Sequence, residues 1–161
     1  MNKMIFMALG LLALSGTLHA EGGKMTGVRQ QVQVESKDGK VVVQISVENG
    51  SGKPVFVPKA VFQDKELFGR TFELTDKASG AEVDYIGPMV KRGPYTKADY
   101  VAVKPGATRS NKIDITRSYA FKPGTHVYQL AYAGNYLADV AMLDAGKPAA
   151  AAPVTFSHTG K

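Results

Sequence analysis

Few side chains in this sequence have the types and spacing that catalysis requires. There is no cysteine, which excludes disulfides, thiolate metal sites and cysteine nucleophiles. Of the three histidines, His19 lies within the first twenty residues, which leaves His126 and His158. No His-Glu-x-x-His zinc motif, Gly-x-Ser-x-Gly nucleophile motif or phosphate-binding glycine loop occurs. The sequence therefore predicts a protein that is not an enzyme and needs no cofactor.

A metal carrier is the weakest of the functions that the remaining residues allow. His126 lies in an alternating run and shares one strand face with Tyr128 and Leu130. This position favours a histidine at the end of a core strand over a metal ligand. Copper carriers combine methionine and histidine ligands. In this chain the methionines considered are scattered and show no His-x-Met spacing: Met25, Met89 and Met142.

The segment from Tyr85 to Tyr100 combines stiffness with positive charge. It contains two Gly-Pro pairs, and proline prevents a continuous strand or helix, so we expect a long ordered loop. Such loops are often functional. Residues 85–125 carry eight basic side chains against two acidic ones. The candidate partner-binding residues are Gly87, Pro88, Lys91, Arg92, Pro94, Tyr95, Asp99 and Tyr100.

The charge of this segment fits either a solvated face or a surface that docks an acidic partner. In the docking interpretation, Lys91 and Arg92 meet acidic groups of the partner, and Tyr95 is an apolar anchor with a polar tip. In the other interpretation the two cations are solvated or pair with Asp84 and Asp99. Nucleic acid is not an expected partner, because basic and aromatic residues do not interleave.

Short alternating runs predict the framework that positions this loop. The clearest is 41–48, in which Val43 and Ile45 face the core. Asp38-Gly39 before it predicts a hairpin turn. Further strands are expected over 28–35, 54–57 (at an edge), 70–75, 82–86, 100–103, 111–116 and 125–132, with no helix. This pattern predicts an antiparallel immunoglobulin-like β-sandwich of seven to eight strands.

The two ends of the 161-residue chain differ from its middle. Residues 1–20 have a positive start at Lys3, an apolar run and a small residue at Ala20, which predicts a signal peptide cleaved before Glu21. We therefore expect a periplasmic or secreted monomer without a membrane anchor. Residues 21–146 are assigned to the sandwich. Residues 147–161 are expected to form an Ala/Pro linker over 147–153, whose side chains are too small to pack, and a short C-terminal tail over 154–161.

Several motifs between Tyr85 and Thr125 occur in an order seen in one group of secreted proteins. They are Tyr85-Ile-Gly-Pro, Lys91-Arg-Gly-Pro, Asp99-Tyr, Lys104-Pro-Gly, Asp114-Ile-Thr, Ser118-Tyr and Pro123-Gly-Thr. In this order and approximate spacing the chain resembles the N-terminal pro-region of deuterolysin-like zinc metalloendopeptidases, the aspzincins. His126 stands where the pro-region pattern has a tyrosine. The upstream strands fit the pattern more loosely.

The resemblance implies a partner as well as a fold. In that family the pro-region precedes a catalytic domain with the zinc-binding motif, and this motif is absent here. The resemblance therefore implies a free-standing pro-domain that binds a secreted zinc metalloendopeptidase and inhibits it or assists its folding. The main alternative is a structural or adhesion module that shares only the sandwich with such pro-regions.

Overall fold

The computed structural model describes residues 27–161, so the expected signal peptide and its cleavage site lie outside the described residues. Within this range no helix is long and apolar enough to cross a membrane.

The elements in chain order are β1 (Val28–Lys37), β2 (Lys40–Asn49), β3 (Val55–Pro58), α1 (Lys59–Phe62), β4 (Glu73–Asp76), the 3-10 turn η1 (Lys97–Asp99), β5 (Tyr100–Val103), β6 (Thr108–Asp114), β7 (Gly124–Tyr132), β8 (Asn135–Tyr136), β9 (Lys147–Pro148) and β10 (Ala151–Gly160).

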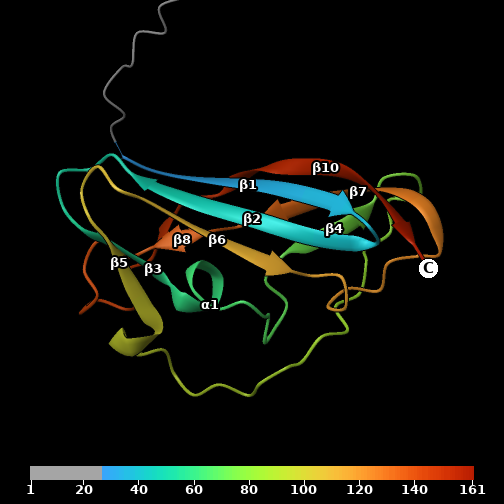
Figure 1. Cartoon of the computed structure of the whole chain (residues 1–161). Coiled ribbons are helices and arrows are strands. Elements are labelled where there is room, and N and C mark those ends of the chain that lie inside the picture. Colours follow the sequence, from blue (N-terminus) through green and yellow to red (C-terminus); the bar gives the residue numbers. More distant parts are fainter. Residues whose placement is uncertain (1–26) are drawn as a thin grey trace, which may run out of the picture.

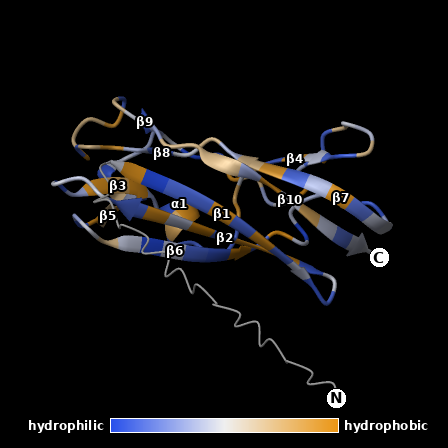
Figure 2. Cartoon of the chain, turned by 90° about the horizontal axis from the view of Figure 1, so that it is seen from above, coloured by the Kyte–Doolittle hydropathy of each residue, from blue (hydrophilic) through white to orange (hydrophobic). Residues whose placement is uncertain are grey.

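The predicted antiparallel β-sandwich is confirmed. One sheet has the order β1-β2-β6 and the other the order β10-β7-β4, with the edges β1 and β10 running alongside each other (Figure 1). Two smaller pairs, β3-β5 and β8-β9, lie at one end of the sandwich (Figure 2). Eight of these strands have four residues or more, and β8 and β9 have two each; seven of the eight lie where the sequence predicts a strand, and the eighth is β10.

The β1–β2 hairpin follows directly from its sequence. Asp38 and Gly39 both have positive φ angles, 53° and 74°, as the tight hairpin turn requires. Hydrophobic and hydrophilic residues alternate along β1 and β2 (Figure 2). Val43 and Ile45 are fully buried, which confirms them as core residues. They pack in one core with side chains of the opposite sheet, such as Leu74 and Tyr128.

Two buried polar side chains fix the connections between the sheets. The Tyr119 hydroxyl donates to the carbonyl oxygen of Phe72 (2.7 Å) and accepts from its N–H (3.0 Å), so it substitutes for a missing strand partner. Burial raises the pKa of Tyr119 to about 12, so this hydroxyl stays protonated. Asn111 of β6 donates to the carbonyl oxygens of Val61 (2.9 Å) and Asp64 (2.6 Å), which holds α1 against the sheet edge.

The prediction of a linker and free tail over 147–161 is wrong. Residues 151–160 form β10, which pairs with β7 from Ala151↔Tyr132 to Gly160↔Gly124. Its inward side chains Phe156 and His158 are buried. The sandwich therefore extends to Gly160 rather than ending at residue 146. The alanine-rich start gave no signal, because alternation becomes visible only from Val154 onward.

Two smaller expectations also need correction. Residues 82–86 form isolated bridges, Thr75↔Glu82 and Tyr85↔Tyr119, instead of a strand. The described chain also contains the one-turn helix α1 and the turn η1, where no helix is expected from the sequence. Both occur where the chain leaves a short strand or enters one, so neither changes the class of the fold.

Candidate partner-binding loop

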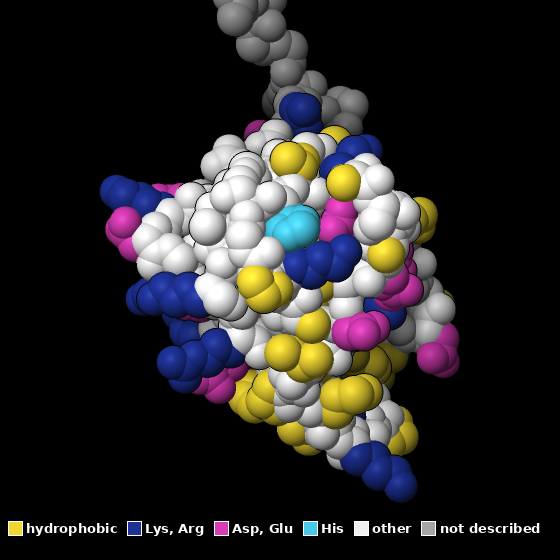
Figure 3. Space-filling view, turned by 90° about the vertical axis from the view of Figure 1, so that its right-hand side faces the viewer, with side chains coloured by type: hydrophobic (Ala, Val, Ile, Leu, Met, Phe, Trp, Pro, Cys, Tyr) yellow, Lys and Arg dark blue, Asp and Glu magenta, His cyan; other side chains and the backbone are white. Residues whose placement is uncertain are grey.

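The predicted long loop is present and lies outside the two main sheets. Residues 86–99, here called the Gly-Pro loop, contain no strand and no helix before η1. The loop runs along the lower side of the molecule toward β5 (Figure 1). Hydrophobic side chains gather on the lower part of the face shown in Figure 3. The framework therefore presents the loop at the surface, where a partner can reach it.

Tyr85 braces the start of the Gly-Pro loop. Its hydroxyl accepts a hydrogen bond from the Gly69 N–H (3.2 Å). The same hydroxyl donates toward the carbonyl oxygens of Pro88 (2.8 Å) and Leu67 (3.1 Å). Partial burial raises the pKa of Tyr85, which keeps this donor in place at neutral pH. One side chain thus ties the loop to the segment around residues 67–69.

Gly87 is needed at this brace for steric reasons. A Cβ atom at Gly87 would lie 2.6 Å from the Tyr85 hydroxyl oxygen, closer than such atoms approach. The N–H groups of Ile86 (2.9 Å) and Gly87 (3.2 Å) both donate to the carbonyl oxygen of Ser118. The first Gly-Pro pair therefore begins the loop at a fixed point beside β6 and β7.

The other end of the Gly-Pro loop is closed by a capping box. The Asp99 carboxylate accepts from the N–H (2.8 Å) and the hydroxyl (2.9 Å) of Thr96. These hydrogen bonds, led by the one from the Thr96 backbone, lower the pKa of Asp99. The rings of Tyr95 and Tyr100 pack with centroids 6.2 Å apart. Asp99 and Tyr100 therefore hold the loop in shape, whereas the sequence interpretation placed them in contact with the partner.

The middle of the loop exposes apolar side chains. Met89 is 80% exposed, Ile86 62% and Val90 53%. Tyr95, the predicted anchor, is 55% exposed, and Phe68 lies nearby at 39%. Soluble proteins tolerate single exposed apolar residues, but a group of them often marks an interaction site. Tyr95 is thus accessible, and Phe68 and Val90, which the sequence did not indicate as site residues, line the same concavity.

A groove of about 430 Å³ lies between the loop and the segment before β4. Its lining residues are Phe68, Val90, Arg92, Gly93, Pro94, Tyr95 and Asp99. The N–H of Val90 donates to the carbonyl oxygen of Phe68 (3.4 Å), which joins the two walls. Four of the eight predicted residues, Arg92, Pro94, Tyr95 and Asp99, therefore meet at one concavity.

Lys91 and Arg92 are exposed and make no ion pair or hydrogen bond within residues 27–161. The alternative in which they pair with Asp84 or Asp99 is therefore wrong as a direct contact. Arg92 still lowers the pKa of Asp99 through its longer-range charge. Both cations remain available to an acidic group of another molecule.

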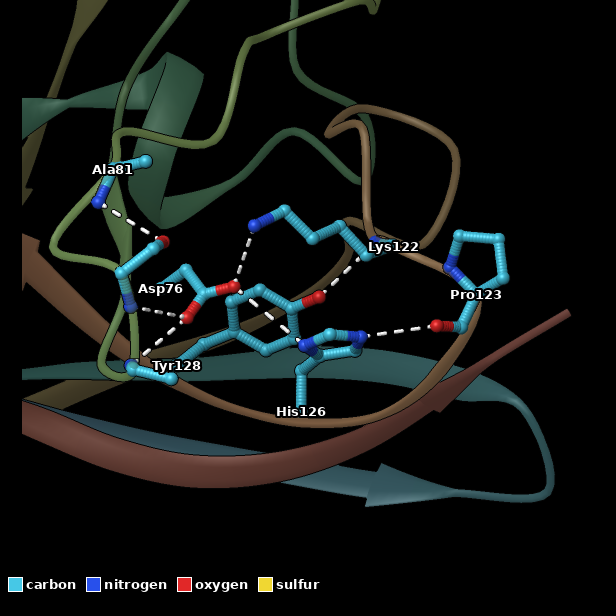
Figure 4. A network of polar contacts seen from close by, with 8 residues as sticks. Asp76, Ala81, Lys122, Pro123, His126 and Tyr128 are labelled. Carbon is cyan, nitrogen blue, oxygen red and sulfur yellow. Dashed lines mark hydrogen bonds and ion pairs between the residues drawn. The ribbon is translucent and has the colours of Figure 1, made fainter.

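A separate polar cluster occupies the end of the sandwich near the C-terminus. One histidine reaches the surface there, beside basic and acidic side chains (Figure 3). Asp76 of β4 is 2% exposed and accepts a hydrogen bond from Lys122 Nζ (2.8 Å), with His126 Nδ1 3.6 Å away (Figure 4). The hydrogen bond from Lys122 is the main reason that the pKa of Asp76 falls to about 2.

This cluster has the contacts of a structural turn. Asp76 also accepts from the N–H groups of Ala78 (2.9 Å) and Ser79 (3.2 Å), which closes the turn after β4 (Figure 4). His126 Nε2 lies 3.0 Å from the carbonyl oxygen of Pro123, so both ring nitrogens face groups of the fold (Figure 4). Over residues 27–161, no three His, Asp or Glu side chains are grouped as metal ligands.

Comparisons with known proteins do not assign the chain to a family. No family model matches the sequence, and no curated protein matches it. Among solved structures, the chain is similar to one titled "X-ray structure of Northeast Structural Genomics Consortium target SoR45". The two are 12% identical, with a TM-score of 0.44 over 83% of this chain and 87% of the other. That title states no activity, ligand or partner.

Proposed function

We propose that this protein is an exported, non-catalytic binding domain that holds a secreted deuterolysin-like zinc metalloendopeptidase through its Gly-Pro loop. The observation that supports it most is a loop braced at both ends that exposes apolar and basic side chains at its centre. The identity of the partner comes from the resemblance of residues 85–132 to the pro-regions of such peptidases. In this function the chain inhibits the peptidase or assists its folding.

The bracing favours binding because it reduces the entropy cost of ordering the loop on a partner. Tyr85 and the Thr96–Asp99 box fix the two ends, and the two prolines restrict the residues between them. A loop that is already ordered in the free protein loses less conformational entropy on binding, so more of the favourable contact free energy remains as affinity. A braced loop favours the binding of any protein partner in this way. The charge of the loop indicates which kind of partner it binds.

Lys91 and Arg92 supply that charge, because the domain offers them no close acidic partner. They would meet carboxylates at the rim of the peptidase cleft, where charge-assisted hydrogen bonds are stronger than neutral ones. Tyr95 beside them would bury its ring while its hydroxyl stays in contact with water.

The test replaces Lys91, Arg92 and Tyr95 together with Ala and measures inhibition of a deuterolysin-like peptidase. We expect inhibition to weaken at least tenfold, about 1.4 kcal/mol. The melting temperature should stay nearly unchanged, because none of the three side chains is buried. The matched control replaces Lys53, Lys147 and Met142, which also removes two cations and one exposed large side chain.

The control variant should inhibit as well as the unaltered protein. Equal inhibition by the loop variant would place the interface elsewhere on the domain. Failure of the unaltered protein to bind or inhibit any such peptidase would reject the proposed function and leave the structural-module alternative.

A further inference from the structure

We infer that the groove beside the Gly-Pro loop receives a large apolar side chain of the partner that is flanked by an Asp or Glu side chain. This inference rests on the proposed function, because it specifies what the peptidase presents to the loop. It differs from a model in which the loop itself inserts into the peptidase, since here the concave surface belongs to this protein.

The walls of the groove determine the apolar part of the occupant. Phe68 and Val90 face it from two chain segments, and Pro94 and Tyr95 complete the lining. A volume of about 430 Å³ lies within the range of sites that bind small molecules. It is large enough for an aromatic or long aliphatic side chain together with the group next to it.

Arg92 determines the charged part of the occupant. Its guanidinium lines the groove without an ion pair or hydrogen bond to residues 27–161. Asp99, the acidic residue of the lining, directs its carboxylate to Thr96 instead. An incoming carboxylate therefore finds an available bidentate donor at Arg92.

The groove is already formed in the free protein. It is a different surface from the exposed tip of the loop. The Val90 N–H to Phe68 carbonyl hydrogen bond joins its walls, and the Tyr85 hydroxyl fixes both segments at their base. Met89 is more exposed than Phe68, Val90 and Tyr95 but does not line the concavity. Met89 therefore serves as a control: an inserting loop would depend on it, and a receiving groove would not.

The probe is the capped peptide acetyl-Gly-Phe-Glu-Gly-amide, which carries the apolar and acidic groups without a free C-terminal carboxylate. Backbone amide NMR shifts of the full chain are followed up to about 10 mM peptide, which detects affinities near −4 kcal/mol. We expect saturable shifts at Phe68, Val90, Gly93 and Tyr95. The analogue with Gln in place of Glu should bind about threefold more weakly, and so should the analogue with Ser in place of Phe.

Three variants locate the two contacts. Phe68→Ala should weaken the binding of both the Glu peptide and its Gln analogue. Arg92→Gln should abolish the preference for the Glu peptide over the Gln analogue. Met89→Ala should change the affinity for neither peptide. The inference is overturned if no saturable shift occurs, if Phe68→Ala binds normally, or if Met89→Ala weakens binding more than Phe68→Ala does. Binding only of a peptide with a free C-terminal carboxylate would also overturn it.

Measurements with the peptidase separate this inference from the proposed function. If the unaltered chain inhibits the enzyme and Phe68→Ala inhibits it equally well, the groove is rejected and the function stands. If the groove binds the Phe-Glu peptide but the chain neither binds nor inhibits a deuterolysin-like peptidase, the function is rejected and the groove stands.

Discussion

The Gly-Pro loop and the C-terminal segment 147–161 have similar compositions and opposite structures. Both combine proline with small residues, and neither shows a long alternating pattern at its start. The loop stays outside the sheets and exposes Met89 and Tyr95, whereas the C-terminal segment pairs with β7 and buries Phe156 and His158. The two regions differ in the contacts that each of them makes with the rest of the fold.

The C-terminal segment becomes a strand because β7 would otherwise lack a neighbour on that side. The register shifts between Ala151 and Val154, so Pro153 falls in the irregularity, where its missing N–H costs no ladder hydrogen bond. Residues 86–99 of the Gly-Pro loop pair with no strand. Side chains such as Tyr85 and Asp99 satisfy its backbone instead. Composition alone therefore does not distinguish a loop from an edge strand.

Deletion of residues 151–161 should have the largest effect of any change to either region. It removes the partner of β7 from Tyr132 to Gly124 and uncovers the core beside β1. We expect the shortened chain to lose its cooperative thermal transition, measured by circular dichroism.

The complementary change is made in the loop. Replacing residues 89–94 by a Gly-Ser linker of equal length should leave a cooperative transition, because these residues contribute no buried side chain. If the variant with the Gly-Ser linker unfolds, or if the variant without residues 151–161 stays folded, the two regions do not differ in their contribution to stability.

Single substitutions sharpen the same contrast. Phe156→Ala should lower the free energy of unfolding by about 3 kcal/mol, because the ring is buried against Phe121 and Tyr128 and its loss leaves a cavity. Tyr95→Ala removes a ring of similar size from an exposed site and should change stability by less than about 0.5 kcal/mol. Chemical denaturation of both variants measures the difference, and equal losses would contradict it.

These contrasts indicate which features the sequence contained. The alternation of 41–48, the Asp38-Gly39 turn and the irregular loop are local patterns, and the structure has all three. Strand β10 was missed because its stability comes from β7, about twenty residues or more away along the chain. Phe68 was missed for the same reason: its place beside Val90 depends on tertiary contacts that no local pattern records.

The bracing of the loop should have a smaller effect than the packing of β10. Tyr85→Phe removes the hydroxyl that the Gly69 N–H and the Pro88 carbonyl share, which should cost about 1–2 kcal/mol. Amide hydrogen exchange at Gly69 should become faster. Tyr95→Phe is the control in the same loop, since its hydroxyl makes no hydrogen bond in the described chain, and it should leave exchange unchanged. Unaltered exchange in Tyr85→Phe would mean that backbone contacts alone hold the loop.

The smallest expected effect is a difference in how the two regions respond to acid. Burial lowers the pKa of His158 below its ordinary value of 6.5, so the unfolded chain binds this proton more readily than the folded one. The stability of β10 should therefore be complete above about pH 6.5 and fall as the pH drops through that value. Asp99 has a pKa lowered below 3.8, so its support of the loop is present above that pH and lost only below it.

Between pH 6.5 and pH 4.5, acid should thus weaken β10 while the Gly-Pro loop keeps its capping box. His158→Phe tests this, because phenylalanine fills a similar volume beside Phe121 but takes up no proton. The variant loses the hydrogen bond to Ser36 Oγ, so its melting temperature is compared with itself across pH and not with the unaltered protein at one pH. We expect a smaller fall in melting temperature toward pH 4.5 in the variant, with unchanged exchange protection at the Thr96 N–H in both proteins. Parallel falls in the two proteins would assign the acid sensitivity to groups other than His158.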